Sequence, residues 1–193
     1  MVHLGTEVKD LFTVSGSPLR LQKLEAAFNE PPRYGKGIDW SGYTVHDAAS
    51  ILLRFLLRLP EPIIPLPMYE AFQGPVQADE QDSSDTIFAN PAIRRYRHQI
   101  LLLPALSRQL LLYLLDLLAV FASKSESNNL TAKRLATIFQ PAILSPVRAG
   151  EEFVEEEAYR RLSRDVLTFL IENQDNFLVG MSSPTELERE SRK

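Results

Sequence analysis

The arginines of this chain are spaced so that several of them could bind a negatively charged partner together. Arg54 and Arg58 lie four residues apart, so they share one face of a predicted helix. A guanidinium group is planar, always charged and able to donate two parallel hydrogen bonds to a phosphate or carboxylate. Two other predicted helices carry further basic residues: Arg20 and Lys23, and Lys133 and Arg134. This spacing fits either a basic groove for an acidic or phosphate-bearing partner or an ordinary solvated charged face.

Residue types that could catalyse a reaction occur in this chain, but their spacing does not assemble them into an active site. The three histidines, His3, His46 and His98, are scattered, and none has a partner at metal-ligand spacing. His46 falls in the first turn of a predicted helix, where we interpret it as a local hydrogen-bonding residue. The chain has no cysteine, no G-x-x-x-x-G-K phosphate loop and no G-x-S-x-G nucleophile elbow. The sequence therefore predicts no metal site, no cofactor and no catalytic residues of the chain's own.

Composition places the chain among ordinary globular proteins. Its 193 residues suit one domain with a tail, and 45% hydrophobic residues are enough to build a core. The net charge of -4 argues against nucleic-acid binding, which usually requires a basic excess. The start of the chain has no apolar targeting segment, and the lack of cysteine fits a cytoplasmic protein. Residues 100–122 are the most apolar stretch, but they contain Pro104, Arg108 and Asp116, so we expect a buried core helix and no integral membrane segment.

Helical periodicity and helix-end signals predict an all-α fold. Ser17-Pro18 starts a helix that ends at Asn29, and Thr44 caps a helix that stops at Pro60. Further helices are expected around Tyr69 and Phe72, from Pro91 onward, over residues 106–122 and around residues 162–170. Another is expected from Thr131 to Ile138 or Phe139, and Pro141 should end that helix. Polar loops are expected at 77–86, 123–129 and 148–157, and no strand pattern is convincing. The prediction is a bundle of about seven helices over residues 8–180, followed by a disordered polar tail at 181–193.

Four segments, in this order along the chain, carry motifs of one known family. Residues 11–17, Leu-Phe-Thr-Val-Ser-Gly-Ser, are similar to G-I-F-R-V-S-G-S, and residues 45–65 are similar to L-K/R-x-F/Y-L-R-x-L-P-E-P-L. Residues 128–136 resemble N-K-M-T-x-x-N-L-A, and residues 138–145 resemble V-F-x-P-x-L-L. Together these segments resemble the Rho GTPase-activating protein (RhoGAP) domain family. Residues 32–47 look specifically like fungal members that act on Rho proteins of actin and cell-wall signalling.

The resemblance implies a helical bundle that binds a Rho-family small GTPase in its GTP-bound state and stimulates GTP hydrolysis. Family members insert an arginine finger that neutralises charge on the transferred phosphoryl group, an effect worth roughly 10³ to 10⁵ in rate. The partner holds GTP and magnesium, so the chain is expected to be an enzyme regulator and not an enzyme. The positions expected to contact the partner are Arg54, Arg58, Pro62, Arg134 and Ala142.

The arginine-finger position is occupied by threonine in this chain. The finger loop expected from the resemblance consists of Phe12, Thr13, Val14, Ser15 and Gly16, with Thr13 at the finger position. Threonine has no positive charge and is several atoms shorter than arginine, so the main electrostatic contribution is missing. The family's domains also begin with an apolar helix ahead of this loop, and the resemblance implies that this helix is missing here. We therefore consider a weakened activator, a catalytically inactive binding module for a Rho GTPase, and an unrelated helical scaffold.

Overall fold

The computed structural model describes residues 5–74, 90–146 and 157–177. These residues contain eight α-helices and short 3-10 helices, and no strand is found among them. The all-α prediction is confirmed, with one helix more than expected. The expected loop at 77–86, nearly all of the loop at 148–157 and the tail at 181–193 lie outside the described residues.

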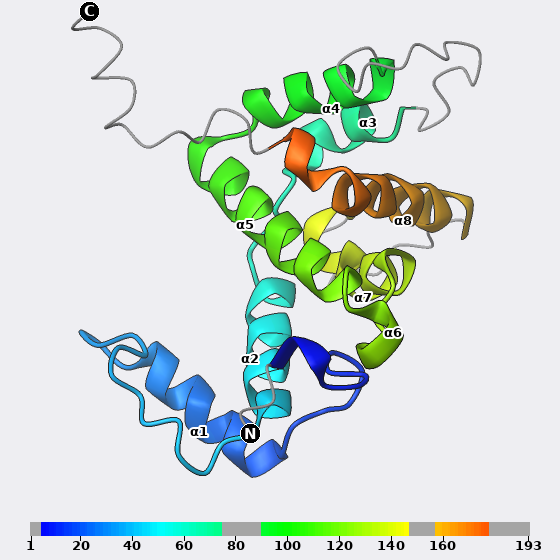
Figure 1. The fold of residues 1–193 in the computed structure, drawn as a ribbon. Coiled ribbons are helices and arrows are strands. Elements are labelled where there is room, and N and C mark those ends of the chain that lie inside the picture. The colour runs from blue at the N-terminus through cyan, green and yellow to red at the C-terminus, as the bar shows by residue number, and fades with distance from the viewer. Residues whose placement is uncertain (1–4, 75–89, 147–156, 178–193) are drawn as a thin grey trace, which may run out of the picture.

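Helices α1 (Pro18–Asn29) and α2 (Val45–Leu57) pack against each other at one end of the molecule (Figure 1). Pro18 occupies the first helical position of α1, where its missing N–H leaves no hydrogen bond unmade. Thr44 begins α2 with a capping box: its side chain accepts from the Asp47 amide, and the Asp47 side chain accepts from the Thr44 amide. Both helices begin at the predicted residues, but the predicted Ser17 cap is not formed, because the Ser17 side chain makes no capping hydrogen bond in α1.

The core lies between α5 (Ala105–Ala122), α7 (Ala132–Ile143) and α8 (Glu157–Glu172). Helix α7 packs against α8, and α5 contacts both of them, while α2 reaches the core through α7. The side chains that fill this space are almost completely buried: Leu111, Leu115, Leu118, Leu135, Phe139, Val166, Leu167 and Leu170. By length and composition alone α5 could cross a membrane, and 33% of its residues are buried inside the bundle.

Shorter elements and α4 complete the bundle. Helix η2 (Leu66–Met68) leads into α3 (Tyr69–Phe72), which packs against α4 (Pro91–Leu102) (Figure 1). Helix η1 (Gly5–Glu7) contacts α5 and α6 (Ser125–Asn128), and η4 (Gln174–Asn176) contacts α5. The proline-rich connector after α2 is extended, and its Ile63 and Ile64 amides donate to the carbonyls of Ala142 and Ile143 at 3.0 Å each.

Two local predictions are wrong. The expected loop at 123–129 contains the one-turn helix α6, which ends at Asn129 in the left-handed region at φ 62°. Helix α7 continues through Pro141 to Ile143 and does not stop before the proline. Pro141 removes a backbone donor, which typically costs about 3 kcal/mol. The helix persists because Pro141 lies in its last turn with an exposed ring, while Ala142 and Ile143 after it are buried.

Candidate functional site

The finger loop begins with two side chains fixed in the core. Leu11 is 4% exposed, and the Phe12 ring lies between Phe121 and Phe139, with ring centroids 5.0 Å away on each side and edge-to-face geometry. Such aromatic pairs typically add about 0.5–1.5 kcal/mol each beyond burial of their area. The loop therefore leaves the core from a fixed point on α5 and α7.

Polar contacts hold the base of the loop against the start of α7. The Asp10 amide donates to the Asn128 carbonyl at 2.9 Å, and the Asp10 carboxylate pairs with the Arg134 guanidinium at 2.7 Å. Asn128 is fully buried and its side-chain amide donates to the carbonyls of Thr6 and Phe121. Asn128 thereby joins the N-terminal segment, the end of α5 and the finger loop at one point.

Thr13 lies at the exposed tip of this loop. Its amide and its hydroxyl both donate to the Asp10 carbonyl at 2.9 Å, which closes a tight turn. Val14 beside it is 50% exposed. The residue at the finger position is therefore exposed, but its side chain is short and its hydroxyl group already donates a hydrogen bond within the turn.

The far end of the loop is attached to α2. The Gly16 amide donates to the Ser50 hydroxyl at 2.9 Å, and the Ser17 amide donates to Asp47 Oδ1 at 2.8 Å. Gly16 is buried, and a Cβ added to it would lie 2.5 Å from Asp47 Oδ1 and 2.7 Å from Asp47 Cα. Glycine is required here because the loop backbone touches the helix backbone.

Gly16→Ala is expected to lower the free energy of unfolding by about 2 kcal/mol, because the α2 backbone cannot move aside cheaply. Chemical denaturation measures this change. Gly5→Ala is the matched control, since its Cβ would meet only Val45 Cγ1 at 3.8 Å and stability should be nearly unchanged. Equal stability of the two variants would contradict the close approach of Gly16 to α2.

Asp47 organises the junction of the loop, α1 and α2. Burial alone raises the pKa of this carboxyl group, but hydrogen bonds from Arg20 Nε, the Thr44 amide and hydroxyl, and the Ser17 amide outweigh burial. The net effect holds the pKa of Asp47 well below its usual value. Asp47 is therefore a buried, fully partnered carboxylate, and Arg20 is its ion-pair partner at 2.7 Å.

One face of α2 carries both the loop attachment and the candidate partner contacts. Asp47, Ser50, Arg54 and Arg58 follow one another at three- and four-residue spacing, which places them along a single helical face. Arg54 is exposed and makes no ion pair among the described residues, whereas Arg58 pairs with Glu25 of α1. The far end of the finger loop and the two arginines are thus carried by the same helix.

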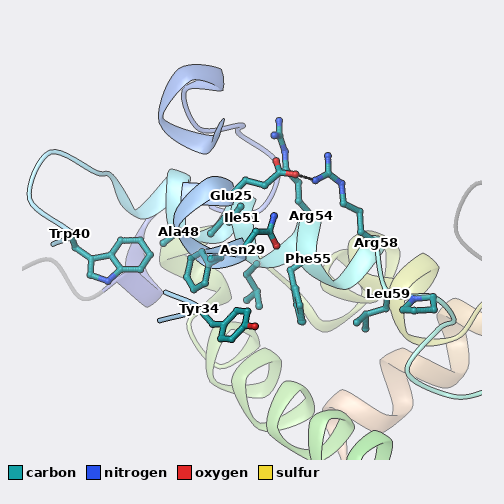
Figure 2. Close-up of a pocket in the computed structure, with 13 residues that line it drawn as sticks. Glu25, Asn29, Tyr34, Trp40, Ala48, Ile51, Arg54, Phe55, Arg58 and Leu59 are labelled. Carbon is teal, nitrogen blue, oxygen red and sulfur yellow. Dashed lines mark hydrogen bonds and ion pairs between the residues drawn. The ribbon is translucent and has the colours of Figure 1, made fainter. Parts of the chain in front are cut away.

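A groove of about 780 Å³ lies beside these arginines, between α2, α1 and the connector that joins them. Figure 2 shows Arg54 and Arg58 next to Glu25 on one side of the groove, with Tyr34 and Trp40 among its other lining residues. The remaining wall is largely apolar: Phe28, Ala48, Ile51, Leu52, Phe55 and Leu59. Arg54 and Arg58 therefore form a basic edge on a groove whose other walls are mostly apolar. Arg20 and Arg134 do not line this groove, and each of them pairs with a carboxylate.

Two of the residues that were expected to contact the partner are buried. Pro62 is buried in the connector after α2, and Ala142 is 2% exposed in the last turn of α7. Both lie where the connector and α7 hydrogen-bond to each other, so they hold this junction together and do not face solvent. The local hydrogen-bonding interpretation of His46 is also unsupported, since its buried Nδ1 has no partner in the described part of the chain.

Sequence reasoning did not single out Asn128, Asp10 or Ser50, which position the finger loop. The signal for Asn128 was available, since Asn-Asn before a capped helix is typical of a tight helix end. The pairings of Asp10 with Arg134 and of Gly16 with Ser50 join distant segments and left no local pattern. Among the described residues no group of three or more His, Cys, Asp or Glu could hold a metal ion.

Two solved structures share this fold. Human Rho GTPase activating protein 15 superposes with a TM-score of 0.74 at 20% identity, covering 90% of this chain and 76% of that one. The BH domain from GRAF, the GTPase regulator associated with focal adhesion kinase, superposes with a TM-score of 0.71 at 24% identity, covering 90% and 86%. The helical bundle that holds the finger loop is therefore the fold of these domains.

The sequence comparison identifies the family. A family model of the RhoGAP domain matches residues 2–148, and the chain belongs to this family. It is 44% identical over 177 residues to Rho-GTPase-activating protein 5 of Schizosaccharomyces pombe, and 37% identical over 170 residues to Rho-GTPase-activating protein BAG7 of Saccharomyces cerevisiae. These matches cover 90% and 83% of this chain but 45% and 38% of the relatives, so the chain spans less than half of their length. The alternative of an unrelated helical scaffold is wrong.

Proposed function

We propose that this chain binds a Rho-family small GTPase in its GTP-bound state and does so without supplying an arginine finger. The observation that carries the proposal is the single α2 face that holds the finger loop through Asp47 and Ser50 and displays Arg54 and Arg58. The family membership supports a Rho GTPase as the partner. The chain then acts as a regulator of another protein's GTPase reaction.

The charge pattern supports recognition of a nucleotide-loaded surface. Arg54 is exposed and lacks an ion-pair partner among the described residues, so its guanidinium can pair with an acidic or phosphate group without first breaking a contact. Arg58 must exchange Glu25 for a new partner, but exposed ion pairs are worth only about 0–1 kcal/mol. The apolar groove beside them supplies area that a protein partner can bury.

Arg54→Ala is expected to weaken binding to a Rho-family GTPase loaded with a non-hydrolysable GTP analogue by about tenfold to a hundredfold. The reason is the loss of an unpaired guanidinium from the centre of the proposed surface. Isothermal titration calorimetry or fluorescence polarisation with Rho, Rac and Cdc42-type partners measures the change, with GDP-loaded protein as the reference for state preference.

Arg161→Ala is the matched control, because Arg161 is an exposed arginine on α8 and not on α2. The control variant should bind like the parent chain. An unchanged affinity of Arg54→Ala would place the partner surface elsewhere.

A weakened activator is the second candidate, because Thr13 still lies at an exposed, firmly held tip. Single-turnover GTP hydrolysis with and without saturating chain separates the two candidates. An unchanged rate in the presence of measurable binding identifies the binding module. A clear acceleration by the parent chain identifies an activator that works without the arginine.

A further inference from the structure

The corner between α4 and α5 exposes three leucine side chains. Leu101 is 60% exposed, Leu102 58% and Leu106 81%, and Leu106 is the most exposed large apolar side chain among the described residues. Figure 1 shows this corner at the periphery of the molecule, away from α1 and the α1–α2 connector. The groove beside Arg54 and Arg58 includes none of the three leucines. The leucines therefore form a protruding apolar tip, which we call the leucine corner.

The exposure of the leucine corner follows from a fixed backbone. Leu103, in the middle of the turn, is 3% exposed and anchors it in the core, and its amide donates to the Ile100 carbonyl at 3.2 Å. The Arg108 amide donates to the Pro104 carbonyl at 2.8 Å, and Arg108 Nη1 donates to the Leu101 carbonyl at 3.0 Å. With Leu103 turned inward, the neighbouring leucines are held outward before any partner arrives.

The segment that forms the leucine corner, together with α4 and the first part of α5, carries charge of one sign. Residues 91–115 contain four arginines and one histidine but no Asp or Glu, in a chain whose net charge is -4. Arg94 is exposed, Arg95 donates to the Ala71 carbonyl, and the guanidinium of Arg108 is bonded directly to the corner backbone. Acidic groups begin at Asp116, three turns further along α5, and on η4, where Asp175 is exposed. Arg108 is therefore the basic group at the corner itself, and Arg94 lies about two turns back along α4 from Leu101.

We propose that the leucine corner docks on the surface of an anionic lipid bilayer. Leucines at a convex tip can enter the boundary between headgroups and acyl chains, while arginines on long stems reach the lipid phosphates. A basic residue near an anionic leaflet strengthens binding by roughly fivefold. Asp116 lies about three turns along α5 from the corner and stays on the water side, which orients α5 with its N-terminal end toward the membrane.

Charge also decides between a bilayer and a second copy of this chain. A symmetric contact through two leucine corners would bring two sets of arginines together, with no carboxylate in residues 91–115 to pair with them. Like charges brought together in this way oppose association. An anionic surface meets the same arginines with opposite charge.

Vesicle co-sedimentation of the whole chain tests the proposal without any GTPase, so its outcome is independent of the proposed function. The parent chain is expected to bind phosphatidylcholine vesicles that contain about one third phosphatidylserine, and to bind pure phosphatidylcholine at least about tenfold more weakly. Leu101→Ser with Leu106→Ser should reduce binding by about tenfold or more, because the apolar contribution is removed. Arg94→Gln with Arg108→Gln, or raised salt, should also weaken binding.

Leu19→Ser is the matched control, because Leu19 is 64% exposed on α1 and far from the corner in sequence. Circular dichroism shows whether each variant is folded. The proposal is overturned if the parent chain binds neither vesicle type or binds both equally well. It is overturned as well if the leucine variant binds vesicles as tightly as the parent chain. It is also overturned if light scattering shows a dimer that Leu106→Ser dissociates, since the corner then serves self-association.

Discussion

Thr13→Arg is expected to raise the rate of GTP hydrolysis by a bound Rho-family GTPase by about 10³-fold over the parent chain. The parent offers the partner a hydroxyl that is already bonded to the Asp10 carbonyl. An arginine at the same exposed tip adds a planar positive group of sufficient length to reach into a partner's nucleotide site. The expected gain is the lower end of the range for an arginine finger, because the loop has no other adaptation to this side chain.

The loop geometry favours this substitution. Phe12 and Asp10 fix one end of the loop in the core and against α7, and Gly16 and Ser17 fix the other end on α2. A preorganised loop holds the new guanidinium in place without further ordering at the moment of reaction. The loss of the exposed Thr13 hydroxyl bond costs about 1 kcal/mol of stability at most.

Single-turnover hydrolysis at saturating concentrations of parent or variant measures the effect, so differences in affinity do not enter the rate. Thr13→Gln is the matched control, since it adds length and hydrogen-bonding capacity but no charge, and it should leave the rate near that of the parent. Thr13→Arg that binds normally and leaves the rate unchanged would show that the tip does not reach the nucleotide. A parent as active as Thr13→Arg would show that the missing guanidinium is not limiting.

Local chemistry accounts for the parts of the fold that were predicted correctly. The Thr44–Asp47 capping box at the start of α2 depends only on residues within one turn, so the sequence contains the whole interaction. Pro18 favours the first position of α1 through its own ring geometry. The same is true of α4, where the Asn90 side chain accepts from the Ala92 and Ile93 amides directly before the predicted start at Pro91. Helix α7 is the exception, since burial of Ala142 and Ile143 outweighs the local cost of Pro141.

The candidate site could be predicted only in part, because the sequence reveals local interactions and not contacts between distant segments. The four-residue spacing of Arg54 and Arg58 is a local property and correctly placed both on one exposed face. Whether a basic residue is free or paired depends on segments far away in the chain, as with Arg134 and Asp10 or Arg58 and Glu25. A motif match likewise identifies which residue of the sequence corresponds to a family position, but it does not show whether that residue is buried, as Pro62 and Ala142 are.

Removing the Asp47 carboxylate is expected to have the largest effect on stability of the substitutions considered. Asp47→Asn should lower the free energy of unfolding by about 3 kcal/mol at neutral pH, because it breaks a buried ion pair and turns amide hydrogens toward donors. The amide side chain keeps the shape of the carboxylate, so the loss reports charge and hydrogen bonding and not a cavity. Asp116→Asn, on the exposed face of α5, is the control and should change stability by less than about 0.5 kcal/mol.

The pH dependence of this difference gives a sharper test. The pKa of Asp47 in the folded chain lies below its ordinary value of 3.8, so the unfolded chain takes up a proton first as the pH falls. The stability contributed by Asp47 is therefore fully present above about pH 5, and it is lost progressively as the pH falls through 3.8 toward the lower folded value. Denaturant unfolding should show parent and Asp47→Asn well separated at neutral pH and converging below pH 3.8. A separation that stays constant down to the acid limit would mean that the Asp47 charge contributes nothing, and that the junction of the finger loop with α2 depends on packing alone.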